Sequence, residues 1–124
     1  MWIPYNPNPF GSRTGDCVIR ALTKVLDMDW GEVYAALSIQ GYIFGDWGNK
    51  NHIWGAYLRN QGFSRGFIPD TCPACYTVAD FCEEHPQGVF VLAAASHVVA
   101  VEDGNYFDSW DSGGEVPIYY WRRD

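Results

Sequence analysis

The hydrophobic period of this chain changes after Pro86, and this change restricts the fold more than any other feature of the sequence. Before Pro86, apolar residues recur at three- and four-residue steps, as they do on one face of an α-helix. After it, short runs rich in valine and small apolar residues predict strands at 88–95, 97–102, 106–110 and 118–121. The pattern indicates an α+β domain whose N-terminal helices pack on a C-terminal antiparallel sheet, folded as a meander.

Four helices are predicted before the sheet, each from an N-cap residue, an apolar face and a terminating residue, at about 16–26, 29–41, 50–61 and 77–85. Asp16 is the expected N-cap of the first helix, which places Cys17 at the first helical position. Three prolines lie within residues 1–11, where each fixes its own φ and removes a backbone donor. Residues 1–11 are therefore expected to form an extended arm.

Length and charge exclude several classes of protein. The chain has 124 residues, a size typical of one domain, so 1–124 is expected to be a single domain. Its formal net charge of −7 should repel phosphate backbones and anionic membranes, so neither nucleic acid nor membrane is an expected partner. The sequence contains no apolar run long enough to span a membrane and no signal-peptide pattern. The expected location is the cytoplasm, or the cytoplasm of a host cell.

The four cysteines are expected to be reduced thiols, because a chain with no secretion signal and a sufficient core rarely needs disulfides. Cys72, Cys75, Cys82 and His85 follow a C-x2-C-x6-C-x2-H pattern, which has enough ligands for tetrahedral zinc. Only six residues separate the two ligand pairs, whereas zinc ribbons need about a dozen or more. Incidental packing is favoured, structural zinc is the alternative, and no cofactor is expected.

Cys17 and His97 are the residues best suited to nucleophilic chemistry. The N-terminal end of a helix stabilises a thiolate, and no other cysteine is placed at such an end. Asp16 opposes this effect, because a neighbouring carboxylate disfavours a second anion, so a histidine partner is needed. His97 begins a strand of valine and alanine, where packing gives no reason for an imidazole, whereas His52 and His85 are expected at the surface or at a helix end.

The predicted hairpin after His97 supplies a third residue. If Asp103-Gly104 forms a two-residue type I′ turn, Val99 faces Asp108 in the neighbouring strand. His97 and Asp108 then lie on one face of the hairpin as diagonal neighbours, about 7 Å apart. A three-residue loop would place Asp108 on the opposite face. Because Asp-Gly is a preferred type I′ pair, the sequence predicts a hydrogen bond between the His97 and Asp108 side chains.

Three segments of the chain resemble the papain-like cysteine peptidases, in the order Cys, His, Asn/Asp. They are Gly15-Asp16-Cys17-Val18 entering a helix, Ser96-His97-Val98-Val99-Ala100-Val101, and Asp108-Ser109-Trp110-Asp111-Ser112-Gly113-Gly114-Glu115. The resemblance covers nearly the whole chain, in a form as small as the bacteriocin-leader-processing peptidases and related phage-borne domains. It implies a papain-like fold in which Cys17 is the nucleophile and His97 its base. Asp108 would orient the imidazole, and Trp110 would shield the pair.

The sequence departs from the family pattern around the nucleophile. The residues flanking Cys17 are Asp and Val where the family has a small residue and an aromatic one. Gly11 stands at about the position of the family's oxyanion glutamine. Asn8 and Asn6, in the arm, are the candidates for a side-chain oxyanion donor beside the backbone N–H of Cys17.

The expected function is hydrolysis of an amide, isopeptide or thioester bond in a peptide or protein substrate, through a thioester at Cys17. Two alternatives remain open. One is a catalytically silent papain-like module that binds a host or phage protein, and the other is an acyl- or amine-transferase with the same triad. The aromatic loop at 42–47 is expected to fill gaps in a small fold, with a role in a substrate groove as the alternative.

Overall fold

The computed structural model describes residues 1–12 and 14–123 and contains four helices and six strands within them. The helices are α1 (Cys17–Leu26), α2 (Trp30–Phe44), α3 (Asn51–Asn60) and α4 (Val78–Glu84). The strands are β1 (Trp2–Pro4), β2 (Phe63–Phe67), β3 (Val89–Ala93), β4 (Val98–Glu102), β5 (Asn105–Asp108) and β6 (Tyr119–Arg123). The α+β class expected from the sequence is confirmed.

The strands form one mixed sheet in the order β1-β5-β4-β3-β6-β2, in which β1 runs parallel to β5 and the other pairs are antiparallel. The predicted meander is correct for β3, β4 and β5 but wrong for β6, which pairs with β3 instead of β5. Both edge strands were missed. Strand β1 was missed because prolines in and after it argue against a strand, although an edge strand tolerates them. Strand β2 was missed because Gly66 interrupts its apolar pattern. Glycine is needed there, because a Cβ at this position would overlap the ring of Tyr120.

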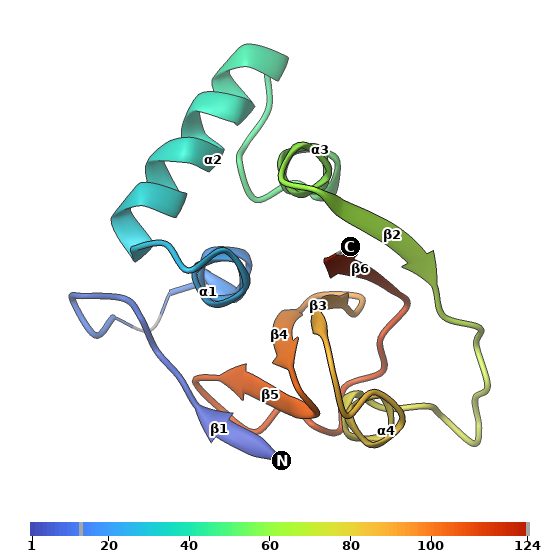
Figure 1. The fold of residues 1–124 in the computed structure, drawn as a ribbon. Coiled ribbons are helices and arrows are strands. Elements are labelled where there is room, and N and C mark those ends of the chain that lie inside the picture. Colours follow the sequence, from blue (N-terminus) through green and yellow to red (C-terminus); the bar gives the residue numbers. More distant parts are fainter. Residues whose placement is uncertain (13, 124) are drawn as a thin grey trace.

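Helices cover both faces of the sheet (Figure 1). Helices α1, α2 and α3 pack on one face, in a core that includes Val91, Ala93, Val98 and Ala100 of the central strands. Helix α4 packs on the other face, against Phe90, Leu92, Val99 and Val101. The central strands are therefore buried on both faces, which explains their continuous apolar sequence. Within the described residues, no helix is both long and apolar enough to cross a membrane.

Helix α2 continues one turn beyond its predicted end at Gly41. It ends at Gly45, which has the left-handed φ of 75° expected of a C-terminal glycine. Gly41 is required for a different reason, because a Cβ there would lie 2.4 Å from the carbonyl oxygen of Asp46. The expectation that the 42–47 aromatics fill gaps is wrong, since Tyr42 is 88% exposed and Trp47 is 75% exposed.

The hairpin between β4 and β5 has the predicted register. Glu102 pairs with Asn105, and Ala100 pairs with Phe107, so the turn contains Asp103 and Gly104 alone. Both turn residues have positive φ, 49° and 80°, as a type I′ turn requires. The register keeps His97 and Asp108 on one side of the hairpin.

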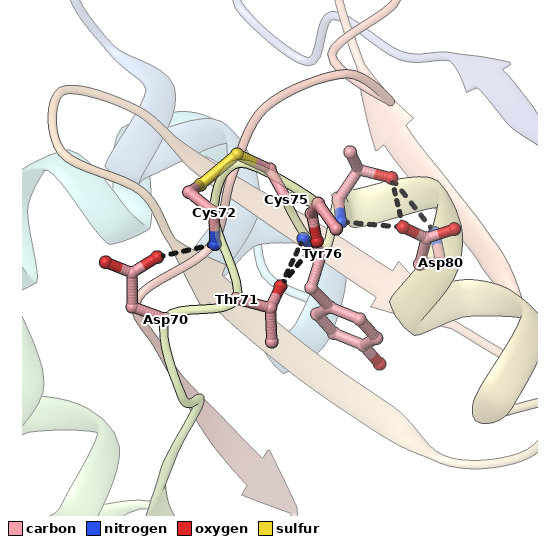
Figure 2. The surroundings of a disulfide bond; sticks show 8 residues. Asp70, Thr71, Cys72, Cys75, Tyr76 and Asp80 are labelled. Atoms are coloured by element: carbon pink, nitrogen blue, oxygen red, sulfur yellow. Dashed lines mark hydrogen bonds between the residues drawn. A yellow bond between two sulfur atoms is a disulfide. The ribbon is translucent and has the colours of Figure 1, made fainter.

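Two of the cysteines expected as thiols form a disulfide instead, Cys72–Cys75 (Figure 2). The intervening Pro73 and Ala74 form a turn that brings the two Cα atoms within 4.1 Å, a proximity that the spacing in sequence does not disclose. The hydroxyl of Thr71 donates to the Ala74 carbonyl at 2.8 Å and so fastens this loop. Among the described residues, no group of three metal-ligating side chains exists for the alternative zinc site.

Reduction of the Cys72–Cys75 disulfide is expected to have only a small effect on stability. The bond closes a loop of four residues, and the loss of chain entropy in the unfolded state grows with loop length, giving about 2 kcal/mol or less here. Urea unfolding with and without a phosphine reductant measures this difference. Cooperative unfolding caused by the reductant alone would contradict the expectation.

Candidate active site

Cys17, His97 and Asp108 lie together, although they come from three separate elements. Cys17 is the first residue of α1, His97 directly precedes β4, and Asp108 ends β5. The predicted hydrogen bond is present, with Nε2 of His97 2.5 Å from Oδ2 of Asp108. This contact leaves Nδ1 as the imidazole nitrogen available to Cys17, and hydrogen bonding between His97 and the thiol influences the pKa of both.

Asp108 is buried, with only 2% of its surface exposed, and both of its carboxylate oxygens accept hydrogen bonds. Besides His97, its carboxylate accepts hydrogen bonds from the Ser112 hydroxyl at 2.7 Å and the Ser109 N–H at 2.8 Å. Burial raises the pKa of Asp108, but the hydrogen bonds from His97 and Ser112 lower it by more than burial raises it. The net pKa therefore lies below its usual value. The carboxylate therefore remains ionised and fixes the orientation of the imidazole.

The pKa values of the thiol and the imidazole shift in opposite directions. Burial raises the pKa of Cys17, but hydrogen bonding from His97 and from the Val98 N–H, with the positive charges of His97 and Arg20, brings it below its ordinary value. Burial lowers the pKa of His97, yet its bonds to Asp108 and Cys17 raise it to about 9. Both shifts favour the thiolate–imidazolium form of the pair relative to isolated side chains, and that form is the reactive one for a nucleophilic cysteine.

Arg20 belongs to the site and was missed from the sequence. It is 8% exposed, its Nη1 pairs with Asp16, and its Nη2 lies 3.1 Å from Asp108 Oδ1. Asp16 also accepts a hydrogen bond from the Trp30 indole at 2.9 Å, and its side chain makes no cap hydrogen bond. The expectation that Asp16 opposes the thiolate is thus corrected, because Arg20 neutralises that carboxylate. The i,i+4 spacing of Asp16 and Arg20 was the available signal.

The remaining predicted site residues lie around this centre. The Trp110 ring packs against the His97 ring, with centroids 4.8 Å apart at 48°. Asn8 is buried, and its Oδ1 accepts the Phe10 N–H at 2.9 Å. Asn6 lines a cavity beside Trp110. The described residues include no hydrogen bond from either asparagine to Cys17, so neither oxyanion candidate is distinguished by a contact.

Two cavities lie on either side of the segment that leads into α1, and Thr14 lines both. One has a volume of about 680 Å³, with Asn6, Arg20 and Trp110 in its wall. The other, of about 590 Å³, lies between the start of α1 and α2 and has an aromatic wall made by Trp30, Tyr34 and Trp47. Cys17 lines neither cavity, but its neighbour Asp16 lines one and Arg20 lines the other, so space for a ligand exists close to the site.

The other histidines and free thiol lie apart from this centre. His85 hydrogen-bonds through Nδ1 to the Phe81 carbonyl at 2.8 Å, at the end of α4, and His52 is exposed beside Asp46. Both match the helix-end and surface roles expected for them. Cys82 is buried, and burial raises its pKa to about 11. It has none of the activation that Cys17 receives.

The opposite pKa shifts of Cys17 and His97 predict how unfolding depends on pH. The lowered pKa of Cys17 makes the stability rise with pH, whereas the raised pKa of His97 makes it fall, so the two effects oppose each other in the wild type. In Cys17→Ser, the opposing effect of the thiol is removed, and the bond to Asp108 is what still raises the pKa of His97. The resulting stabilisation is complete below about pH 6.5 and is lost as the pH rises. Urea unfolding at increasing pH above this value should show a steeper loss in Cys17→Ser than in the wild type. Parallel pH profiles would contradict the pairing.

No protein-family model, curated protein or solved structure matches this chain. Function is therefore inferred from the geometry of the site. That geometry combines a half-buried thiol at a helix start, an imidazole with a raised pKa and an ionised carboxylate behind it.

Proposed function

We propose that this chain is a papain-like thiol hydrolase that cleaves an amide, isopeptide or thioester bond in a peptide or protein substrate. The observation that carries the proposal is the hydrogen-bonded series in which Asp108 holds Nε2 of His97 and His97 lowers the pKa of Cys17. A fixed carboxylate, a base and a nucleophile in this order are the elements of a catalytic triad.

In the first half of the proposed reaction, the Cys17 thiolate attacks the carbonyl carbon, and a new C–S bond forms. The imidazolium of His97 gives its proton to the leaving nitrogen or sulfur as the bond to the carbonyl carbon breaks. The product is a thioester at Cys17 with a neutral His97. The raised pKa of His97 favours storage of this proton before the attack.

In the second half, a water molecule attacks the thioester carbon through its oxygen, and His97 takes a proton from that water. The C–S bond then breaks, the carboxylic acid leaves, and the thiolate–imidazolium pair returns. Asp108 keeps the imidazole in the same orientation through both halves, because its four hydrogen-bond donors hold the carboxylate in place. The backbone N–H of Cys17, at the first helical position, is the proposed main donor to the oxyanion.

An activated ester and a panel of added amines test this function. Reaction with p-nitrophenyl acetate should release a burst of nitrophenol equal to the protein concentration, with the acetyl group mapped to Cys17 by mass spectrometry. Cys17→Ser should abolish the burst, whereas Cys82→Ser should preserve it. Absence of a burst in the wild type would instead support the silent binding module. Preferential transfer to added amines over water would support the transferase.

A further inference from the structure

A third cavity lies at the far end of the sheet, between α3 and the strands β2 and β6. It has a volume of about 370 Å³ and shares no lining residue with the two cavities beside Cys17. Its wall includes Arg59, Arg65, Tyr119 and Trp121, and no carboxylate lines it. In a chain of net charge −7, this is a local concentration of positive charge.

Both arginines lie over aromatic rings, and neither has an acidic partner among the described residues. Cζ of Arg65 lies 4.2 Å from the centre of the Tyr119 ring, and Cζ of Arg59 lies 5.3 Å from that of Trp121. Within residues 1–12 and 14–123, neither guanidinium takes part in an ion pair. Stacking uses the face of a guanidinium and leaves its N–H edge available for an anion.

A buried donor in the same wall also lacks a partner. Trp121 is 4% exposed, and its Nε1 makes no hydrogen bond within the described residues. A Cβ at Gly55 would lie 3.0 Å from Cζ2 of this indole, so the missing side chain at position 55 makes room for the ring edge that carries Nε1. Because Nε1 is enclosed by the protein, it does not contact a ligand in the cavity, but its indole ring forms part of the wall and reports on what binds there.

We propose that this cavity binds a phosphate group, held by the guanidiniums of Arg59 and Arg65, which lie over the rings of Trp121 and Tyr119 in its wall. Two guanidiniums together offer more N–H donors than one carboxylate can accept, whereas the oxygens of a phosphate can accept from both. The group belongs either to free phosphate or to a small phosphate ester. This proposal goes beyond the thiol hydrolase activity and does not depend on it, since the cavity lies away from Cys17.

Titration of the folded protein with inorganic phosphate tests the site. In a ¹H–¹⁵N spectrum at constant ionic strength, the assigned indole signal of Trp121 should shift and saturate. The indole signals of Trp2, Trp30, Trp47 and Trp110 should not shift, because none of these residues lines the cavity. Arg59→Gln and Arg65→Gln should each weaken binding by about tenfold or more, because each removes a charged donor. Lys24→Gln removes one charge elsewhere in the chain, beside Glu102, and should leave the affinity unchanged.

Three ligands then distinguish the sources and the alternatives. Tighter binding of phenyl phosphate than of inorganic phosphate would identify the ligand as an ester, and the reverse would identify the free anion. Equal binding of acetate would overturn the preference for phosphate. The proposal would also be overturned if the Trp121 signal failed to saturate, or if Lys24→Gln weakened binding as much as the two arginine variants do.

Discussion

Iodoacetamide at about pH 6 is expected to alkylate Cys17 well before Cys82, and His97→Ala is expected to slow this reaction by about tenfold or more. An isolated thiol is less than about 1% thiolate at this pH, whereas His97 lowers the pKa of Cys17. Cys82 is both buried and protonated, with a pKa of about 11, so the comparison of the wild type with His97→Ala is the decisive one. Peptide mass mapping over a time course gives both rates.

The Asp108→Ala variant should lose less Cys17 reactivity than His97→Ala, because Asp108 orients the base while His97 contacts the thiol. Similar alkylation rates at Cys17 and Cys82 would contradict the activation of Cys17. A Cys17 rate that does not change in His97→Ala would contradict it as well. The chain would then be better described as a binding module without thiol chemistry.

Arg20→Met is expected to lower the free energy of unfolding by about 3–5 kcal/mol, which is the largest stability effect proposed for this protein. The guanidinium pairs with Asp16 and Asp108, whose side chains are 4% and 2% exposed. Its removal leaves two buried carboxylates without their shared cation, and a buried charge is costly once its partner is lost. Urea unfolding at neutral pH measures the change.

Lys24→Met provides a matched control on the same helix. Lys24 pairs with Glu102 at 3.1 Å, but the two side chains are 28% and 36% exposed, so water screens the pair. The expected loss is about 0–1 kcal/mol. If the Arg20 and Lys24 variants unfolded at the same urea concentration, Arg20 would be a peripheral contact, and the proposed link between α1 and Asp108 would be wrong.

Local chemistry in the sequence determined the α+β class, the start of the helix at Cys17 and the register of the β4–β5 hairpin. Each depends on residues a few positions apart. The Asp103-Gly104 pair adopts positive φ within its own turn, and the alternation of the flanking strands then places His97 and Asp108 on one face. The hydrogen bond between those side chains could therefore be predicted before the sheet was known.

Tertiary structure alone decided the strand order, the close approach at Gly41 and the role of Arg20. Each of these depends on segments that meet only when the chain folds. Gly41 is needed because Asp46 returns against the helix, and Arg20 reaches a carboxylate 88 residues away. Neither contact leaves a periodic signal, since periodicity records which face of an element is buried and not which distant residue covers it. The pairing of Arg20 with Asp16 is local, at the i,i+4 spacing, whereas its contact with Asp108 is set by that packing.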